Sequence, residues 1–222
     1  MYILNLETAT RNCSVSVADN GKTLFCKEIA SESFSHAELL HRFINEVLLA
    51  TNLTLNDFSA VAISKGPGSY TGLRIGVSAA KGLCYALEIP LISVDTLAVL
   101  ASQIEVENGL IIPMIDARRM EVYSATFNNN HKKITETKAI ILDENTFSEL
   151  SETVYFIGDS NEKAKTVLTK SNFVFLDNNL FPSSNEMSAL SFEKFLNYDF
   201  EDVASFEPYY LKDFLITTPS KS

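Results

Sequence analysis

Short apolar runs and amphipathic stretches follow one another along the chain and predict strands and helices in turn. Apolar runs at 2–6, 14–18 and 23–29 predict three strands. The tripeptide Asp19-Asn20-Gly21 predicts a hairpin between the second and third, because Asn and Gly adopt positive φ at low cost. Helical spacing over 36–50 predicts a helix, with Ser35 and Glu38 as a capping box. A strand at 60–64, a helix from Gly72 to Leu87, a strand at 90–94 and a helix at 96–104 complete this unit.

The pattern then restarts. An apolar strand at 110–115 ends in Asp116, as the first strand ends in Glu7. Further strands are predicted at 121–127, 133–142, 154–157 and 173–176, a turn at 128–130, and helices at 144–150, 161–170 and 184–196. A shift of about 109 residues lays the second hairpin on the first. The sequence therefore predicts an α/β protein of two βββαβα halves with mixed sheets covered by helices, divided into residues 1–106 and 107–222.

The glycine-rich segment from Ser64 to Gly76 joins the strand at 60–64 to the next helix. Its glycines and Pro67 predict a tight turn, and the Thr71 hydroxyl is expected near the free N–H groups at the start of the helix. A Walker loop is excluded because Leu73 replaces the required lysine, and a dinucleotide fingerprint would need glycine at Thr71. A structural turn is favoured over a phosphate site, which stays open as the alternative.

Small residues recur every four positions in the helix after this turn. Each helical glycine costs about 1 kcal/mol relative to alanine, so another backbone is expected to approach closely. Either both ladders pack on the protein's own sheet, or one of them meets a partner helix. The two ladders are Gly72, Gly76, Ala80 and Ser78, Gly82, Ala86.

Composition narrows the class of protein. The chain has 222 residues, of which 46% are hydrophobic, enough for a sizeable core. Its formal net charge of −10 argues against nucleic-acid binding by the chain alone, since phosphate contacts need clustered Lys and Arg. Cys13, Cys26 and Cys84 are widely spaced, as in buried thiols of a reducing compartment. No leader or membrane-length apolar run is visible, so a cytoplasmic protein without a membrane partner is expected.

Four segments carry a family resemblance. They are Lys65-Gly66-Pro67-Gly68-Ser69-Tyr70-Thr71-Gly72-Leu73-Arg74-Ile75-Gly76, the opening Ile3 to Thr10, the middle Ile115 to Tyr123, and Glu207 to Lys212. Together they resemble the bacterial TsaB (YeaZ) family over essentially the whole chain. The resemblance implies actin-like (ribonuclease H-like) lobes and a role in making threonylcarbamoyladenosine on tRNA, next to the anticodon. It implies a non-catalytic scaffold that binds a TsaD-like catalytic subunit, acts with a TsaE-like ATPase, forms a homodimer when alone, and meets tRNA only indirectly.

The resemblance also implies a relic nucleotide cleft between the lobes. Its residues are Glu7, Thr8, Thr10, Asp116 and Gly158. Hydrogen bonding at strand ends is the alternative role for these side chains and is favoured. Asp159 stands beside a single glycine where the fold would place a glycine pair beneath adenosine, and a carboxylate repels phosphate unless a cation intervenes. No tightly bound cofactor is expected, and ATP or ADP is expected only in the complex.

Catalytic machinery is not predicted. TsaD-like enzymes carry a His-x-x-x-His pair in the helix after the strand at 90–94, and those positions fall on Thr96 and Leu100. His36 and His41 are five apart, off-register for one helix face, and His131 is distant. No catalytic or metal-binding residue is therefore assigned. The alternative is an actin-like enzyme in its own right, an ATPase, kinase or peptidase.

A partner interface is predicted on the helices at 36–50 and 72–87. The first is apolar nearly all round and the second carries the small-residue ladders. The resemblance points to the same helices for both self-association and TsaD-like binding. The residues assigned to this interface are Leu39, Leu40, Phe43, Val47, Gly72, Arg74, Ile75, Ser78, Gly82 and Tyr85.

Overall fold

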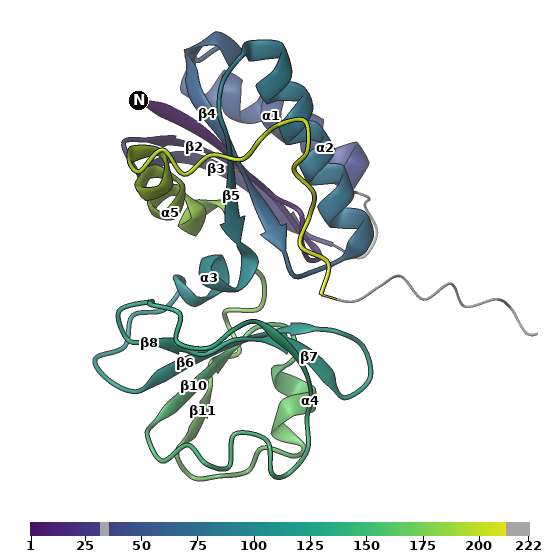
Figure 1. Cartoon of the computed structure of the whole chain (residues 1–222), viewed down its shortest axis with the longest axis vertical. Helices are drawn as coiled ribbons and strands as arrows, with labels where there is room; N and C mark the ends of the chain where they lie inside the picture. Colours follow the sequence, from purple (N-terminus) through teal and green to yellow (C-terminus); the bar gives the residue numbers. More distant parts are fainter. Residues whose placement is uncertain (32–35, 212–222) are drawn as a thin grey trace, which may run out of the picture.

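The computed structural model describes residues 1–31 and 36–211, and over these residues the chain forms two mixed β-sheets arranged along its long axis (Figure 1). Helices pack on both sheets, so the expected α/β class is confirmed. The predicted cap Ser35 and the motif residue Lys212 lie outside the described residues. Within the described residues, no helix has the length and apolar character needed to cross a bilayer.

The first sheet has the strand order β3-β2-β1-β4-β5. β1 pairs antiparallel with β2 and parallel with β4. Asn20 (φ 48°) and Gly21 (φ 80°) form the predicted hairpin in the left-handed region that these residues tolerate. The strands are β1 (Tyr2–Glu7), β2 (Asn12–Asp19), β3 (Lys22–Ala30), β4 (Phe58–Gly66) and β5 (Leu91–Asp95).

The second sheet repeats the first. Its order is β9-β7-β6-β10-β11, and each pair of neighbours runs in the same relative direction as its counterpart in the first sheet. The predicted duplication is confirmed by this topology. The strands are β6 (Leu110–Asp116), β7 (Glu121–Ser124), β9 (Lys138–Ile141), β10 (Val154–Ile157) and β11 (Phe173–Phe175), with the short β8 (Phe127–Asn128) paired to β6.

Two predicted strands are shorter than expected. The strand predicted at 121–127 breaks after Ser124, because the chain leaves β7 and returns to β6 as β8. This detour places Phe127 in the core between the sheet and α3 (Thr96–Ala101). The strand predicted at 133–142 begins only at Lys138.

Of the predicted helices, two are shorter than expected and one does not form. The helix at 96–104 ends at Ala101 as α3, and that at 161–170 ends at Lys165 as α4 (Asn161–Lys165). The helix at 144–150 is wrong. Asp143 and Thr146 bond to each other in a turn, and Phe147 has φ 60°, which interrupts a helix while its ring enters the core of the second sheet.

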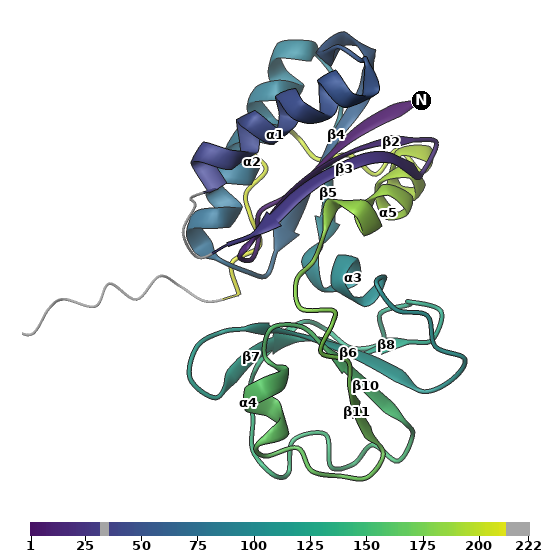
Figure 2. The same cartoon turned by 180° about the vertical axis from the view of Figure 1, so that it is seen from behind.

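The first sheet is covered on both faces. α1 (His36–Thr51) and α2 (Tyr70–Leu87) pack on one face, and a short 3-10 turn, η1 (Leu55–Asp57), links α1 to β4. α5 (Ser184–Leu196) covers the other face, although it comes from the second half of the sequence (Figure 2). In return, α3 from the first half packs on β6 of the second sheet. The division at residue 106 thus separates the two sheets, while the last helix of each half packs on the sheet of the other.

α5 meets the first sheet through a polar seam. Ser191 donates to the side-chain oxygen of Asn5 at 2.7 Å, and the hydroxyls of Ser14 and Ser184 lie 2.6 Å apart. All four residues are buried. Buried polar groups need partners, so this seam fixes the position of α5.

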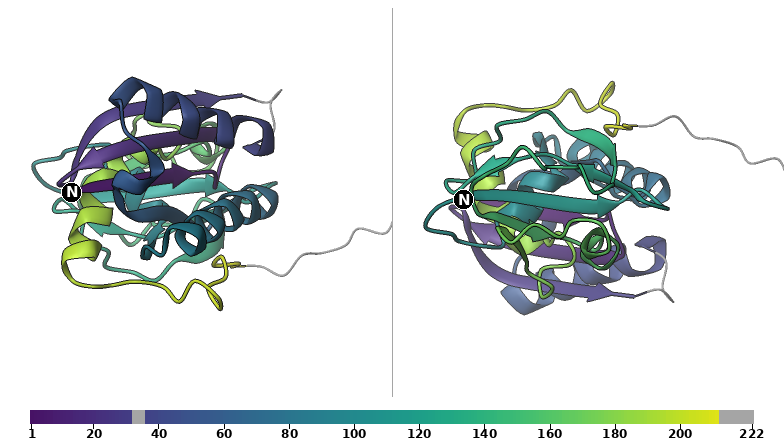
Figure 3. Two further views of the ribbon diagram at one scale, coloured as in Figure 1. Left: turned by 90° about the horizontal axis from the view of Figure 1, so that it is seen from above. Right: turned by 90° about the horizontal axis from the view of Figure 1, so that it is seen from below.

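The segment after α5, residues 197–211, is called here the strap. It passes the edge of β5, where Glu201 N–H donates to Leu91 O at 2.8 Å, and continues along α2 (Figure 3). Lys81 of α2 donates to the carbonyls of Ala204 and Phe206 at 3.1 and 2.9 Å. Tyr209 N–H then donates to Lys65 O at 2.7 Å. The strap therefore brings the end of the described chain to the start of α2.

Candidate functional site

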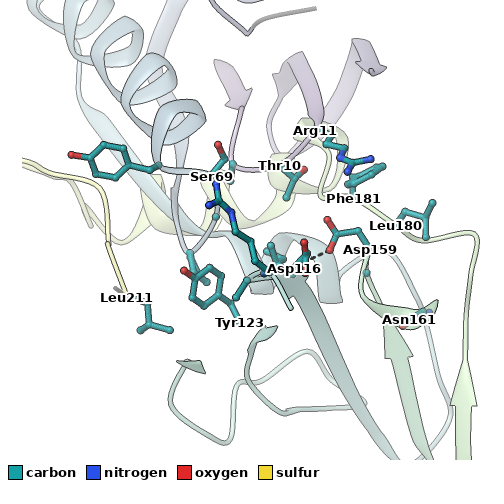
Figure 4. A pocket seen from close by; sticks show the side chains of 18 of the residues that line it. Thr10, Arg11, Ser69, Asp116, Tyr123, Asp159, Asn161, Leu180, Phe181 and Leu211 are labelled. Atoms are coloured by element: carbon teal, nitrogen blue, oxygen red, sulfur yellow. Dashed lines mark hydrogen bonds between the residues drawn. The ribbon is translucent and has the colours of Figure 1, made fainter. Parts of the chain in front are cut away.

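A cleft of about 1220 Å³ lies between the two lobes (Figure 4). It is formed where β1, β4, β6 and β10 reach their carboxyl ends, the usual place for a binding site in sheets of this kind. The first lobe contributes residues 9–11 and 67–71, the second residues 115–118, 158, 159, 161 and 162, and the strap Tyr209, Tyr210 and Leu211.

The glycine-rich turn lies against the first wall of this cleft. A Cβ on Gly68 would come within 2.3 Å of Ala9 O, and Ser69 N–H donates to the same carbonyl at 2.6 Å. Position 68 therefore requires glycine because another backbone lies against it, and this agrees with a structural role for the turn. The expected hydroxyl at the helix start is not that of Thr71. Ser69 is the N-cap of α2 and accepts from Gly72 N–H, because it sits just outside the first turn.

Only part of the predicted relic nucleotide cleft lines the observed cleft. Thr10, Asp116 and Gly158 line it, whereas Glu7 and Thr8 are fully buried beneath its wall. Ala9 N–H donates to Glu7 Oε1 at 2.6 Å, and the Ser64 hydroxyl donates to Oε2. Burial raises the pKa of Glu7 to about 7, against the effect of these hydrogen bonds. Glu7 thus performs the strand-end hydrogen bonding that was the favoured alternative.

Asp116 is tied into the second lobe. Lys163 of α4 forms an ion pair with its carboxylate and also donates to the carbonyls of Arg119 and Glu121 at 2.9 and 2.6 Å. Arg118 and Arg119 have φ of 71° and 51°, so the turn that follows β6 is left-handed at two successive non-glycine residues. Lys163 therefore holds together the turn that carries Arg118 to the cleft.

Asp159 also lines the cleft, although it was not among the residues predicted for the relic nucleotide cleft. Its carboxylate accepts from the backbone N–H of Asp116 at 2.8 Å. Burial raises its pKa to about 6. The sequence signal was the acid placed beside Gly158, and its contact with β6 became visible only in the fold.

No group of three or more His, Cys, Asp and Glu residues suited to a metal ion occurs within residues 1–31 and 36–211. His36 Nε2 lies 2.7 Å from Thr10 O, and burial lowers the pKa of the ring. At the two positions compared with a metal-binding pair, the Thr96 hydroxyl accepts from Gly66 N–H at 3.1 Å and Leu100 is fully buried. Both side chains are therefore committed to the fold.

The second candidate surface is α2, whose two small-residue ladders face opposite ways. Gly72 and Gly76 are buried against Thr8, where an added Cβ would meet oxygen atoms at 2.1 and 2.2 Å. Gly82 has nothing within 4 Å of an added Cβ, and Tyr85 is 82% exposed. One ladder therefore packs on the sheet and the other faces outward.

The α1 part of the predicted interface is wrong, because its residues are buried. The apolar residues assigned on α1 are buried in the chain's own core against β2, β4 and α2, so they offer no free surface. Gly72 is buried and Ile75 packs at the margin of the same core. The outward strip of α2 keeps Arg74, Ser78, Gly82 and Tyr85. The buried residues assigned on α1 are Leu39, Leu40, Phe43 and Val47.

Tyr210 of the strap packs against the end of this strip, beside the cleft. The guanidinium of Arg74 lies 4.0 Å from the ring centroid of Tyr70, and its Nε donates to the Tyr210 hydroxyl at 3.1 Å. The rings of Tyr70 and Tyr210 are 4.9 Å apart. The strap and α2 therefore present one continuous surface at the cleft mouth.

Comparison with known proteins gives a consistent result. The family described as "TsaD: tRNA N6-adenosine threonylcarbamoyltransferase" matches residues 28–207. The tRNA threonylcarbamoyladenosine biosynthesis protein TsaB of Escherichia coli is 30% identical over 96% of this chain and 95% of its own length. The solved structure of YeaZ from Pseudomonas aeruginosa has a TM-score of 0.83 at 23% identity and covers 95% of this chain and 99% of that chain. A dehydratase activator from Clostridium difficile with bound ADPNP has a TM-score of 0.50 at 8% identity, covering 90% of this chain and 97% of its own, which bears on the fold alone. The expected actin-like fold is confirmed.

Proposed function

Because this chain belongs to the TsaB (YeaZ) family, whose members take part in tRNA threonylcarbamoyladenosine biosynthesis, we propose that it is a non-catalytic subunit that binds a TsaD-like transferase. In this proposal the transferase modifies the tRNA adenosine next to the anticodon, and a TsaE-like ATPase acts with the pair. The chain meets tRNA only through the complex, which suits its net charge of −10.

The outward strip of α2 is the observation that carries the proposal. It is long, exposed and built from small residues around Gly82, where a second helix can approach closely. Tyr85 adds an exposed aromatic ring of the kind enriched at protein interfaces. An interface centred here is expected to bury about 1,200–2,000 Å² in total.

The cleft supports the non-catalytic part of the proposal. The carboxylate of Glu7 accepts hydrogen bonds from Ala9 N–H and the Ser64 hydroxyl, and the Thr96 hydroxyl accepts one from Gly66 N–H. These groups stabilise the first lobe and do not face a substrate. We propose that ATP or ADP binds only once the complex has formed.

Titration of the purified chain with its cognate TsaD-like protein tests the proposal. Ser78→Leu and Gly82→Leu are expected to weaken binding about ten- to hundredfold, because overpacking a contact typically costs about 1–3 kcal/mol. Ala189→Leu is the matched control, since Ala189 is an exposed small residue of α5. Normal binding by folded Ser78 and Gly82 variants would move the interface elsewhere.

The alternative function, an actin-like enzyme acting alone, has a separate test. The isolated chain is assayed for ATPase, kinase and peptidase activity, and the mixture with the transferase for tRNA modification. Activity of the isolated chain that is abolished by one cleft substitution, such as Asp116→Ala, would favour the alternative. Modification that requires both proteins favours the subunit.

A further inference from the structure

In the cleft, the backbone N–H of Asp116 already donates a hydrogen bond to an acidic side chain of the same chain. The N–H of Asp116, at the end of β6, donates to Asp159 Oδ1 at 2.8 Å (Figure 4). Backbone N–H groups at the ends of strands are the donors that bind phosphate oxygens in many folds. Here the donor already has an anionic partner from the same chain.

Gly158 makes this contact geometrically possible. Its φ is +116°, and a Cβ at this position would come within 2.1 Å of Met114 O. The loop after β10 therefore lies directly on β6, and its N–H at Gly158 is held by Asn179 O at 2.8 Å. The position of Asp159 is consequently set by backbone packing.

Positive charge around Asp159 comes from both lobes. Lys163 of α4 and Arg11 of the first lobe both favour its ionised form, while burial and the neighbouring carboxylate of Asp116 oppose it. Arg11 and Asp159 line the same cleft. The pKa of Asp159 is about 6, so the side chain is anionic at neutral pH.

We propose that the carboxylate of Asp159 stands in the cleft where a ligand's phosphate would bind. It accepts the hydrogen bond of the Asp116 N–H and is attracted by Arg11, and so it excludes phosphate-bearing ligands from the free chain. The phosphates of the nucleotide that the fold implies therefore do not fit the part of the cleft beside Asp116 and Asp159. A phosphate entering there would lose the Asp116 donor and meet two carboxylates. This inference concerns the isolated chain and holds whichever partner the outward strip of α2 binds.

Calorimetric titration with pyrophosphate, and separately with ADP and Mg²⁺, tests the proposal on the full chain. Asp159→Ser removes the charge and draws the acceptor oxygen back by one bond from the Asp116 N–H, and is expected to bind pyrophosphate at least about tenfold more tightly than the unmodified protein. Asp159→Asn removes the charge but keeps an acceptor for the Asp116 N–H, so a smaller gain is expected. Glu162→Gln is the control, because it removes a neighbouring acid of the same cleft without touching Asp116.

Two results would overturn the proposal. They are equal binding of pyrophosphate by the unmodified chain and Asp159→Ser, and a gain of the same size in Glu162→Gln. If Asp159→Ser does not fold, Asp159→Asn decides by the same criterion. Hydrogen exchange gives an independent check, since the Asp116 amide is expected to be protected in the unmodified protein and fast exchange there would contradict the contact.

Discussion

The hydroxyl of Thr8 donates to the carbonyl oxygen of Gly72 at 2.8 Å, which fastens the start of α2 to the end of β1. The same approach leaves no room for a side chain at position 72, because an added Cβ would lie 2.1 Å from Thr8 O. The backbone of α2 therefore lies in direct contact with the backbone that follows β1. This contact explains why a residue with poor helix propensity stands in the first turn of α2.

Alanine substitutions on the two faces of α2 are expected to act in opposite directions. Gly72→Ala forces backbone apart and lowers the free energy of unfolding by about 1–3 kcal/mol or more. Gly82→Ala has open space around it and raises the same quantity by about 0.5–1 kcal/mol through helix propensity. Urea denaturation of both variants measures the changes, and destabilisation by Gly82→Ala would show that this face is not free.

Stability is expected to depend on pH through Glu7. Its pKa is about 7 in the folded chain, compared with 4.5 when unperturbed, because burial disfavours the charge. Between these values the folded state holds a proton that the unfolded state has released. The free energy of unfolding therefore falls as pH rises from 4.5 to 7, by about 3 kcal/mol from this group, and no further above pH 7.

Glu7→Gln isolates this effect. The amide stays neutral and can still accept from Ala9 N–H, so the variant is expected to match the unmodified protein near pH 4.5 and exceed its stability at pH 8. Urea denaturation over this range gives the difference between the two proteins, in which the titration of Asp159 cancels. Parallel curves for the two proteins would refute the prediction.

Lys81 is expected to hold the strap on α2. Lys81→Met removes two charge-assisted hydrogen bonds, to Ala204 and Phe206, while keeping most of the side-chain packing. Faster proteolytic cleavage within 203–210 is expected, with a loss of about 1–2 kcal/mol in the free energy of unfolding. Lys22→Met, at the exposed first hairpin, is the control and should leave cleavage of the strap unchanged.

Self-association and partner binding are expected to compete, since the family resemblance points to the same two helices for both and only α2 keeps an outward strip. Sedimentation of the chain at rising concentration measures the homodimer, and addition of the TsaD-like protein should convert it to the heterodimer. Gly82→Leu should weaken both associations together. A ternary species containing the homodimer and the transferase would show that two separate surfaces are used.

Local pattern determined a large part of this fold. The hairpin at Asn20 and Gly21 and the bounds of α5 were predictable because turn chemistry and apolar periodicity act over a few residues. The duplication followed from the same local signals occurring twice. The helical glycines likewise indicated a close backbone approach, although their partner, Thr8, could not be named.

Only the tertiary structure decided which groups face one another. The periodicity of α1 could not tell core from interface, and Phe43 proved to lie in the core because the sheet supplies its neighbours. The serines of α5 look like a solvated face until Asn5 of the first strand meets them. Asp159 accepts a hydrogen bond from the backbone of Asp116, which lies 43 positions away in the sequence. The loop that brings them together needs glycine at position 158, where a side chain would collide with Met114 O. Such contacts depend on how distant strands stack, and no local propensity encodes that.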